Sequence, residues 1–266
     1  MMEHITSPTN PKIKFAINLQ QKKYRDKFEM FLLEGIRNAE MALSQKNDID
    51  MCFCTQKALE NARIQKLVDE LTCPIYLVPD NIYQKLSDTV SPQGLMLVIK
   101  NRPISLENIL ASSDGLYLIL DRLQDPGNLG TIIRTADAMG IKGLICLNGT
   151  ADIYSPKVIR SAMGSIFNID IINKISEDSL LDFIRQNNIE LYATALDDTA
   201  KPSWSVKFPQ KCAIILGNEA NGVSESLLLQ SEKIYIPMLG NAESLNVANA
   251  GSMIMYEYCR QNIDHK

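Results

Sequence analysis

Hydrophobic positions follow two spacings along the chain. Short apolar runs alternate with longer stretches in which apolar residues recur every three or four positions. The runs predict strands and the longer stretches predict amphipathic helices. In the first hundred residues we expect strands at 28–35, 49–54, 74–79 and 94–100 and helices at 36–45, 58–71 and 80–88. This pattern predicts a compact α/β domain of about 100 residues, an ordinary domain size.

The second half of the chain repeats this alternation. We expect strands at 116–121, 143–148, 167–172, 189–196, 212–217 and 233–238, and helices at 129–139, 156–164, 178–187, 223–230 and 246–262. Strands that alternate with helices predict a mostly parallel sheet with helices on both faces. A polar stretch with Pro103, over 101–115, predicts a linker. We therefore expect two α/β domains, 1–104 and 105–266.

Three loops of the second half are candidates for a binding site. Parallel sheets bind ligands beyond the carboxyl ends of their strands, which directs attention to the loops after Leu120, Leu216 and Ile236. Each loop is polar, contains glycine and leads into a helix. The first has neither the G-x-G-x-x-G pattern of dinucleotide-binding proteins nor a phosphate-binding loop that ends in Gly-Lys-Ser/Thr. This absence argues against a Rossmann oxidoreductase.

The composition narrows the class of protein. The chain has 266 residues, of which 45% are hydrophobic and 22% charged, as in a soluble globular protein. No apolar run reaches the roughly 18 residues of a membrane span, and the N-terminus lacks an export signal, so we expect a cytoplasmic protein. Six cysteines without a C-x-x-C motif and two histidines near the ends predict free thiols and no metal site.

Charge is distributed unevenly along the chain. The net charge is −4, yet residues 1–27 contain six basic and two acidic residues. Because salt screens charges beyond about 10 Å, a basic leader on an acidic protein can still bind RNA locally. A solvated basic helix face is the alternative interpretation.

The three loops contain motifs that are specific in combination. Each motif residue alone has an ordinary explanation, such as helix capping or a solvated side chain. In order and spacing, however, the loops resemble the signatures of the SpoU (TrmH) family of RNA 2′-O-ribose methyltransferases in the SPOUT superfamily. One departure is Ala248, where that family usually has serine. The first motif, N-x-G-x-x-x-R, is met by Asn128, Gly130, Arg134 and Gly140; the second, G-x-E-x-x-G, by Gly217, Glu219 and Gly222; the third by Ile236, Pro237, Met238, Ser244, Leu245, Asn246 and Val247.

The resemblance implies a fold, a cofactor and an assembly. Residues 105–266 would form a parallel sheet with a deep trefoil knot, and residues 1–104 a smaller L30e-like substrate-binding domain. S-adenosylmethionine would be bound largely through the backbone of Gly217, Ile236 and Leu245, with Met238 nearby. The family's enzymes are homodimers whose site is shared between subunits. The helix after Asn246 is a candidate for that interface, and a helix of the core is the alternative.

The resemblance also assigns catalytic roles. A ribose hydroxyl is a poor nucleophile, so a side chain must accept its proton or stabilise the alkoxide. Arg134 matches the family's catalytic residue, either as the base or as a cation that holds the phosphate and stabilises the alkoxide, since arginine stays protonated in proteins. Asn128 and Glu219 would orient Arg134 and the ribose, and Ser244 and Asn246 would complete the site.

The identity of the RNA is a separate expectation. A separate N-terminal substrate domain favours 23S ribosomal RNA, because members that modify transfer RNA often lack one. Methylation of transfer RNA and a non-catalytic RNA-binding assembly factor are the alternatives. The expected RNA-binding residues are Lys157, Arg160, Lys22, Lys23 and Arg25.

Overall fold

The computed structural model describes residues 2–106, 109 and 114–262. It divides into two compact units. The first comprises Met1–Arg102 and Tyr154–Phe167, and the second comprises Pro103–Ile153 and Asn168–Lys266. Part of the linker predicted at 101–115 lies outside the described residues. Of the remainder, Ile104, Leu106 and Ile109 pack against the core of the second unit.

The first unit contains a five-stranded sheet in the order β1-β4-β3-β5-β2. Strand β5 runs antiparallel to β2 and β3, and β4 runs parallel to β1 and β3. One hydrophobic core lies between this sheet and α3, α4 and α8, and a second lies between the sheet and α1 and α5. The strands are β1 (Met2–His4), β2 (Met30–Glu34), β3 (Ile49–Cys54), β4 (Ile75–Leu77) and β5 (Leu95–Lys100), and the helices are α1 (Pro11–Asn18), α2 (Lys22–Phe28), α3 (Ile36–Ser44), α4 (Ala62–Glu70), α5 (Asp80–Leu86) and α8 (Pro156–Ala162).

Local chemistry explains where these elements begin and end. The helix predicted over 58–71 is interrupted: Ala58–Glu60 form a 3₁₀ turn, and Asn61 then caps α4 by accepting a hydrogen bond from the Arg63 amide. Helix α1 begins with Pro11 after the cap Asn10, a favoured pairing because proline needs no amide partner in the first turn. Strand β1 was not predicted, because two of its three residues, Glu3 and His4, are polar and no apolar run marks it.

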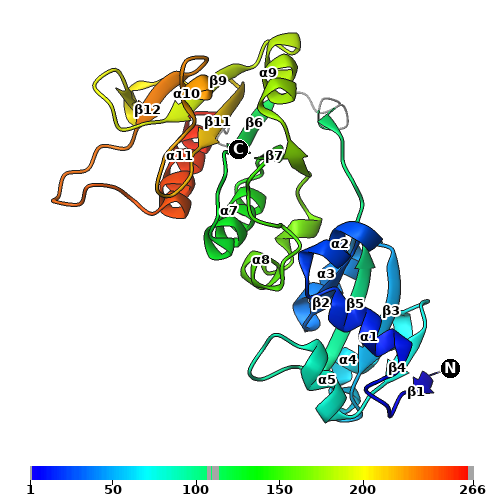
Figure 1. The fold of residues 1–266 in the computed structure, drawn as a ribbon. Helices are drawn as coiled ribbons and strands as arrows, with labels where there is room; N and C mark the ends of the chain where they lie inside the picture. Colours follow the sequence, from blue (N-terminus) through cyan, green and yellow to red (C-terminus); the bar gives the residue numbers. More distant parts are fainter. Residues whose placement is uncertain (1, 107–108, 110–113, 263–266) are drawn as a thin grey trace. The chain divides into compact units, whose positions relative to one another are not determined.

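The second unit contains a seven-stranded sheet in the order β10-β12-β9-β11-β6-β7-β8, and every pairing is parallel (Figure 1). The predicted mostly parallel sheet is therefore confirmed. Strand β8 starts later than predicted, because Ser165–Phe167 form a 3₁₀ turn. The strands are β6 (Gly115–Leu120), β7 (Gly143–Leu147), β8 (Ile171–Ile175), β9 (Glu190–Thr194), β10 (Lys201–Pro202), β11 (Lys211–Leu216) and β12 (Glu232–Tyr235), and the helices are α7 (Pro126–Ala138), α9 (Glu177–Gln186), α10 (Glu225–Leu228) and α11 (Val247–Asn262).

Helices cover both faces of this sheet. Residues of α9 and α10 share a core with Tyr117 and Ile119 of β6, whereas α7 and α11 pack against each other. Gly251 of α11 approaches the end of β11 so closely that a Cβ atom would lie 2.6 Å from Leu216 Cδ1. This contact brings the first turns of α7 and α11 to the carboxyl ends of β6 and β11.

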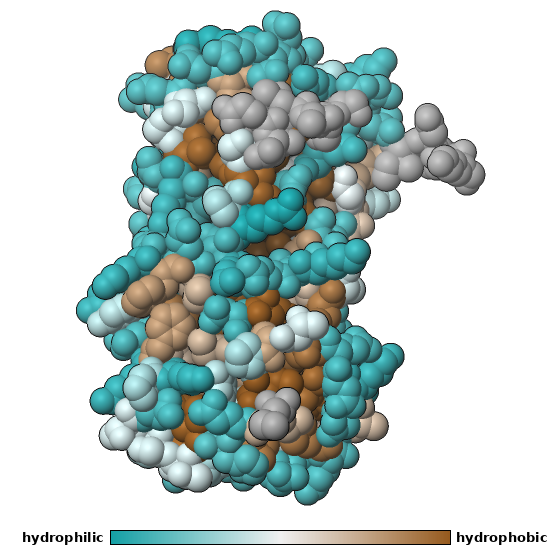
Figure 2. Space-filling view, turned by 90° about the vertical axis from the view of Figure 1, so that its right-hand side faces the viewer, coloured by the Kyte–Doolittle hydropathy of each residue, from teal (hydrophilic) through white to brown (hydrophobic). Residues whose placement is uncertain are grey.

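On the face that Figure 2 shows, most of the surface is hydrophilic, and hydrophobic residues gather in groups between the hydrophilic ones. Within residues 2–106, 109 and 114–262, the helices are too short or too polar to cross a membrane.

The Gly251 contact can be tested by Gly251→Ala. Alanine favours a helix over glycine by about 1 kcal/mol, whereas an extra methyl group in a packed core costs about 1–3 kcal/mol. Because Leu216 and its neighbours are fully buried, we expect a net loss of stability in urea unfolding. A gain of about 1 kcal/mol would show that α11 can move away from β11.

Candidate active site

The first motif lies where β6 leads into α7. Asp125 caps α7 by accepting a hydrogen bond of 2.8 Å from the Asn128 amide, and Pro126 occupies the first helical position. Asn128 therefore lies in the first turn of α7, and its side chain is not needed for capping. The side-chain amide of Asn128 is therefore available to bond residues of the other two loops.

The second motif forms a tight loop after β11. Asn218 and Gly222 exchange two backbone hydrogen bonds of 3.0 and 2.9 Å, and Gly222 has a φ of +67°, which favours glycine. A Cβ atom on Gly217 would lie 2.2 Å from the carbonyl carbon of Gly222. The loop therefore closes on Gly217 and excludes every other residue type there.

Glu219 joins the second loop to the first. Its Oε1 accepts hydrogen bonds of 3.1 Å from the Asp125 amide and from Asn128 Nδ2, and its Oε2 accepts one of 3.1 Å from the Gln124 amide. Burial raises the pKa of Glu219, but the hydrogen bonds outweigh this effect and bring the pKa below its ordinary value. Glu219 is thus held as a carboxylate.

Asn246 joins the third loop to the first. Its Nδ2 donates a hydrogen bond of 2.9 Å to Asn128 Oδ1, while its Oδ1 accepts from the amides of Ala248 and Asn249 at the start of α11. Asn128 thus donates to Glu219 and accepts from Asn246. Only a side chain with both a donor and an acceptor can do this, which explains the amide at position 128.

Asp121 provides a second connection that sequence analysis missed. Its side chain is buried and accepts a hydrogen bond of 2.7 Å from the Ser224 amide as well as two from the Arg122 guanidinium. The Arg122 carbonyl in turn accepts from Asn218 Nδ2 at 2.8 Å. Nothing in the sequence distinguishes Asp121 from an ordinary residue at a strand end.

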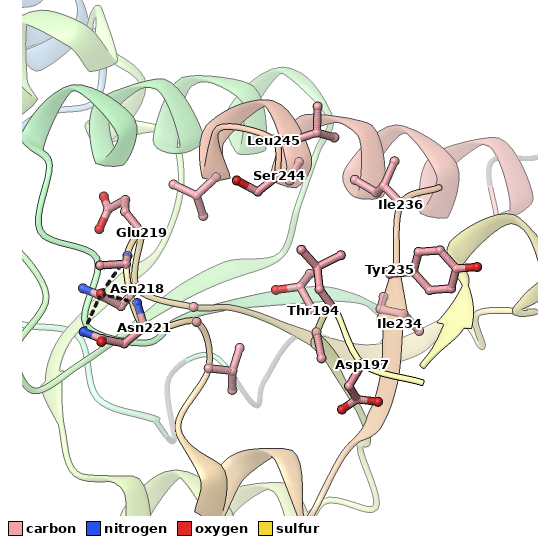
Figure 3. Close-up of a pocket in the computed structure, with 18 of the residues that line it drawn as sticks. Thr194, Asp197, Asn218, Glu219, Asn221, Ile234, Tyr235, Ile236, Ser244 and Leu245 are labelled. Carbon is pink, nitrogen blue, oxygen red and sulfur yellow. Dashed lines mark hydrogen bonds between the residues drawn. The ribbon is translucent and has the colours of Figure 1, made fainter. Parts of the chain in front are cut away.

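These connections form one side of a pocket of about 670 Å³ (Figure 3). Leu228 of α10 and four segments line it: 194–197 at the end of β9, 217–223 after β11, 234–238 at the end of β12, and 244–250 at the start of α11. Sequence analysis predicted the strand β9 but did not predict that the segment after it would line the site. Asp197 belongs to this segment. The Lys233 ammonium of β12, at 2.8 Å, and hydrogen bonds from Thr199 together lower the pKa of Asp197 to about 2.

Most residues that the motifs nominated come together here. Asn128 contacts the residues of the pocket wall without lining it, and Arg134 is also absent from the wall. Arg134 is exposed on α7, six residues and about 9 Å beyond Asn128 along the helix. The wall itself includes Gly217, Glu219, Ile236, Met238, Ser244, Leu245 and Asn246.

The expected RNA-binding residues all belong to the first unit. Lys22 and Lys23 are exposed on α2. Lys157 and Arg160 lie on α8, and Arg160 forms an ion pair of 2.8 Å with Asp88. Arg25 departs from the expectation: it is 7% exposed and donates hydrogen bonds to the carbonyls at the end of α1, at Leu19 and Gln20. Its guanidinium therefore holds α1 and α2 together and is not presented to a ligand.

No group of three or more histidine, cysteine, aspartate or glutamate side chains suited to a metal ion occurs within the described part of the chain. Oxygen and nitrogen atoms of the three loops instead bond to one another. The chemistry available at the pocket is that of hydrogen bonds, two carboxylates and apolar walls.

Comparison with known proteins gives matches over both units. Residues 115–256 match the model of the SpoU rRNA Methylase family, and residues 10–97 match the MRM3-like substrate binding domain. The chain is 35% identical to the 23S rRNA (guanosine(2553)-2′-O)-methyltransferase RlmP of Bacillus subtilis, across 96% of this chain and 98% of that protein.

Two further relatives agree with this result. A 23S rRNA (uridine(2479)-2′-O)-methyltransferase of Streptomyces viridochromogenes is 30% identical, across 92% of this chain and 88% of its own. The crystal structure of an AdoMet-bound rRNA methyltransferase from Sinorhizobium meliloti, 29% identical, superimposes with a TM-score of 0.88 across 99% of both chains. With its three motif loops joined at one pocket, the chain belongs to the SpoU rRNA methylase family.

Proposed function

We propose that this protein transfers a methyl group from S-adenosylmethionine to a ribose 2′-hydroxyl of 23S ribosomal RNA. The observation that carries the proposal is the hydrogen-bonded series Glu219–Asn128–Asn246, which joins the three motif loops beside the pocket. Family membership favours this activity over an oxidoreductase.

The pocket fits the proposed cofactor. Gly217, Ile236 and Leu245, which the family resemblance assigns to the cofactor, line it together with both apolar and polar residues. The Glu219 carboxylate suits a ligand that carries positive charge, whereas the Asp197 carboxylate is already paired with Lys233. S-adenosylmethionine, when bound, supplies a methyl group on a positively charged sulfur.

Arg134 acts on the RNA. Its guanidinium forms no hydrogen bond or ion pair with any residue in the described part of the chain, so it is available to a ligand. As a cation it binds the phosphate beside the target ribose and stabilises the developing alkoxide. The alternative role, acceptance of the hydroxyl proton, would require a neutral guanidine.

A second copy of the chain completes the site. Arg134 lies outside the pocket of its own chain, and α11, which packs beside α7, leaves Met253 and Tyr256 50% and 59% exposed. A homodimer through this face would cover both side chains and bring Arg134 to the partner's pocket. We further propose that residues 105–266 are knotted as in the SPOUT superfamily. The support is membership of the SpoU family, together with the return of the chain from β12 to α11, which packs against α7.

Ribosomal RNA is the favoured target. The two relatives described above, both named for 23S ribosomal RNA, match more than nine-tenths of this chain, and a substrate-binding domain matches residues 10–97. The two named relatives methylate a guanosine and a uridine respectively, so the base at the target position stays open. The compartment that we propose is the cytoplasm, where free thiols persist.

The function can be tested by calorimetric binding of S-adenosylmethionine to the purified protein, followed by transfer of a tritiated methyl group to bulk ribosomal and transfer RNA. Cofactor binding with label in ribosomal RNA supports the proposal. Label in transfer RNA alone would identify transfer RNA as the substrate. Absence of cofactor binding would favour a non-catalytic RNA-binding factor.

Gly217→Ala should weaken cofactor binding. The new Cβ atom would collide with the backbone of Gly222, so the loop must move and the pocket wall with it. We expect the calorimetric affinity for S-adenosylmethionine to fall by about tenfold or more. Gly240→Ala is the matched control, because nothing lies within 4 Å of its Cβ position. Equal affinity in the two variants would contradict the proposed position of the cofactor.

Arg134→Ala should remove transfer without removing the cofactor. Loss of a group that stabilises developing charge costs about 10²–10³-fold in rate, while the pocket wall does not include Arg134. We expect single-turnover transfer to fall by this factor with calorimetric binding unchanged. Arg185→Ala, an exposed arginine on α9, should retain full activity. A fully active Arg134→Ala variant would exclude the assigned role.

The Glu219 carboxylate should make stability depend on pH. Its pKa is lower in the folded protein than the ordinary value of 4.5, so its contribution is fully present above pH 4.5 and is lost as the pH falls below that value. Glu219→Gln lacks this titration and offers one acceptor atom fewer. We expect wild type to be the more stable at pH 7 in urea unfolding, and the difference to shrink below pH 4.5. A difference independent of pH would show that the charge is unimportant.

A further inference from the structure

The first unit carries an aromatic cluster, formed by Phe15, Tyr24 and Phe28, at the surface of α1 and α2. The rings of Tyr24 and Phe28 are parallel within 6°, with centroids 6.3 Å apart, and Phe15 meets Phe28 edge-on at 5.1 Å. Phe15 and Tyr24 also pack against the core beneath them, whereas Phe28 is 37% exposed. The cluster therefore rests on the core, and Phe28 presents part of its ring at the surface.

Lysines lie over the outer faces of these rings. Lys23 Nζ is 4.7 Å from the centroid of Tyr24, and Lys27 Nζ is 5.3 Å from that of Phe28. Lys22 is also exposed, and Asp26 is the one acidic residue of α2. Aromatic faces and positive charge thus share one surface.

This combination matches the chemistry of a single-stranded nucleic acid. Unpaired bases stack on aromatic side chains, and lysines neutralise the phosphates between them. We propose that the aromatic cluster binds an unpaired base of the RNA substrate, while Lys22, Lys23 and Lys27 contact its backbone. The proposal rests on the RNA-directed function above, and α1 and α2 lie within the residues that match a substrate-binding domain.

Arg25 has a positioning role in this site. It points away from the surface and donates hydrogen bonds to the carbonyls of Leu19 and Gln20 at the end of α1. This fixes α2 against α1, so that Phe15 of one helix meets Phe28 of the other. The one buried arginine among the basic residues of α2 thus holds the aromatic cluster together.

The test is fluorescence-anisotropy binding of the full-length protein to a labelled single-stranded oligouridylate of about 12 nucleotides. The double variant Tyr24→Leu/Phe28→Leu keeps the apolar cover of the core but removes both rings. We expect its affinity to fall roughly tenfold with an unchanged salt dependence. Tyr24→Phe should bind as wild type does, and Trp204→Leu, an exposed aromatic residue of the second unit, is the control.

The lysines give an independent signal. Lys23→Gln should reduce the slope of log affinity against log salt by about 0.7, the value for one phosphate contact on a single strand. Lys66→Gln on α4 is the matched control, because Lys66 is exposed on the same unit. Wild-type affinity in the double variant, or an unchanged slope in Lys23→Gln, would overturn the proposal.

Two further measurements separate the possible failures. Ultraviolet crosslinking of wild-type protein to the same oligonucleotide with 5-iodouridine should label the peptide that contains Tyr24 and Phe28. Label confined to other peptides would overturn the proposal without any variant.

Methyl transfer by the wild type tests the proposed function on its own. Active wild-type enzyme with unaltered binding by the double variant would refute only the aromatic site. Loss of self-association in that variant, with RNA binding intact, would assign the surface to a second copy of the chain.

Discussion

The active site depends on one carboxylate. Glu219 accepts three hydrogen bonds from the loop after β6, and Asn128, one of the donors, accepts a fourth bond from Asn246. Loops that are separated by about ninety residues in sequence and held by different strands are thereby joined at their tips. Hydrogen bonds to a charged acceptor are stronger than those to a neutral one, so a neutral side chain at position 219 would weaken the connection between the second loop and the first.

The parallel sheet makes this arrangement possible. Strands β6 and β11 are neighbours in register, so the loops that follow Leu120 and Leu216 emerge side by side. The close contact of Gly251 with Leu216 brings the start of α11 to the same edge. Gly217 then permits the tight loop that forms the pocket wall. The motif residues therefore serve first to build a rigid cavity, and the residue proposed to act on RNA, Arg134, stands outside it.

Much of this could be predicted from the sequence. Apolar runs located the strands because buried parallel strands are continuously hydrophobic, and the motif spacing selected Glu219, Asn128 and Asn246. The misses have physical causes. Asp121 and the segment after β9 act through tertiary contacts that leave no local pattern. Arg25 was expected to bind RNA because it lies among the basic residues of the leader. The sequence does not show that its guanidinium bonds the end of α1. Strands β1, of three residues, and β10, of two, contain no apolar run that could mark them.

The central claim is that this cavity methylates a ribose hydroxyl of RNA. A methyl group on the 2′-oxygen removes the nucleophile that alkali needs to cleave the neighbouring phosphodiester. The most direct measurement is therefore alkaline hydrolysis of ribosomal RNA labelled by the protein with tritiated S-adenosylmethionine. We predict that the label is recovered in alkali-resistant dinucleotides. Label recovered only in mononucleotides would mean methylation of a base and would contradict the account.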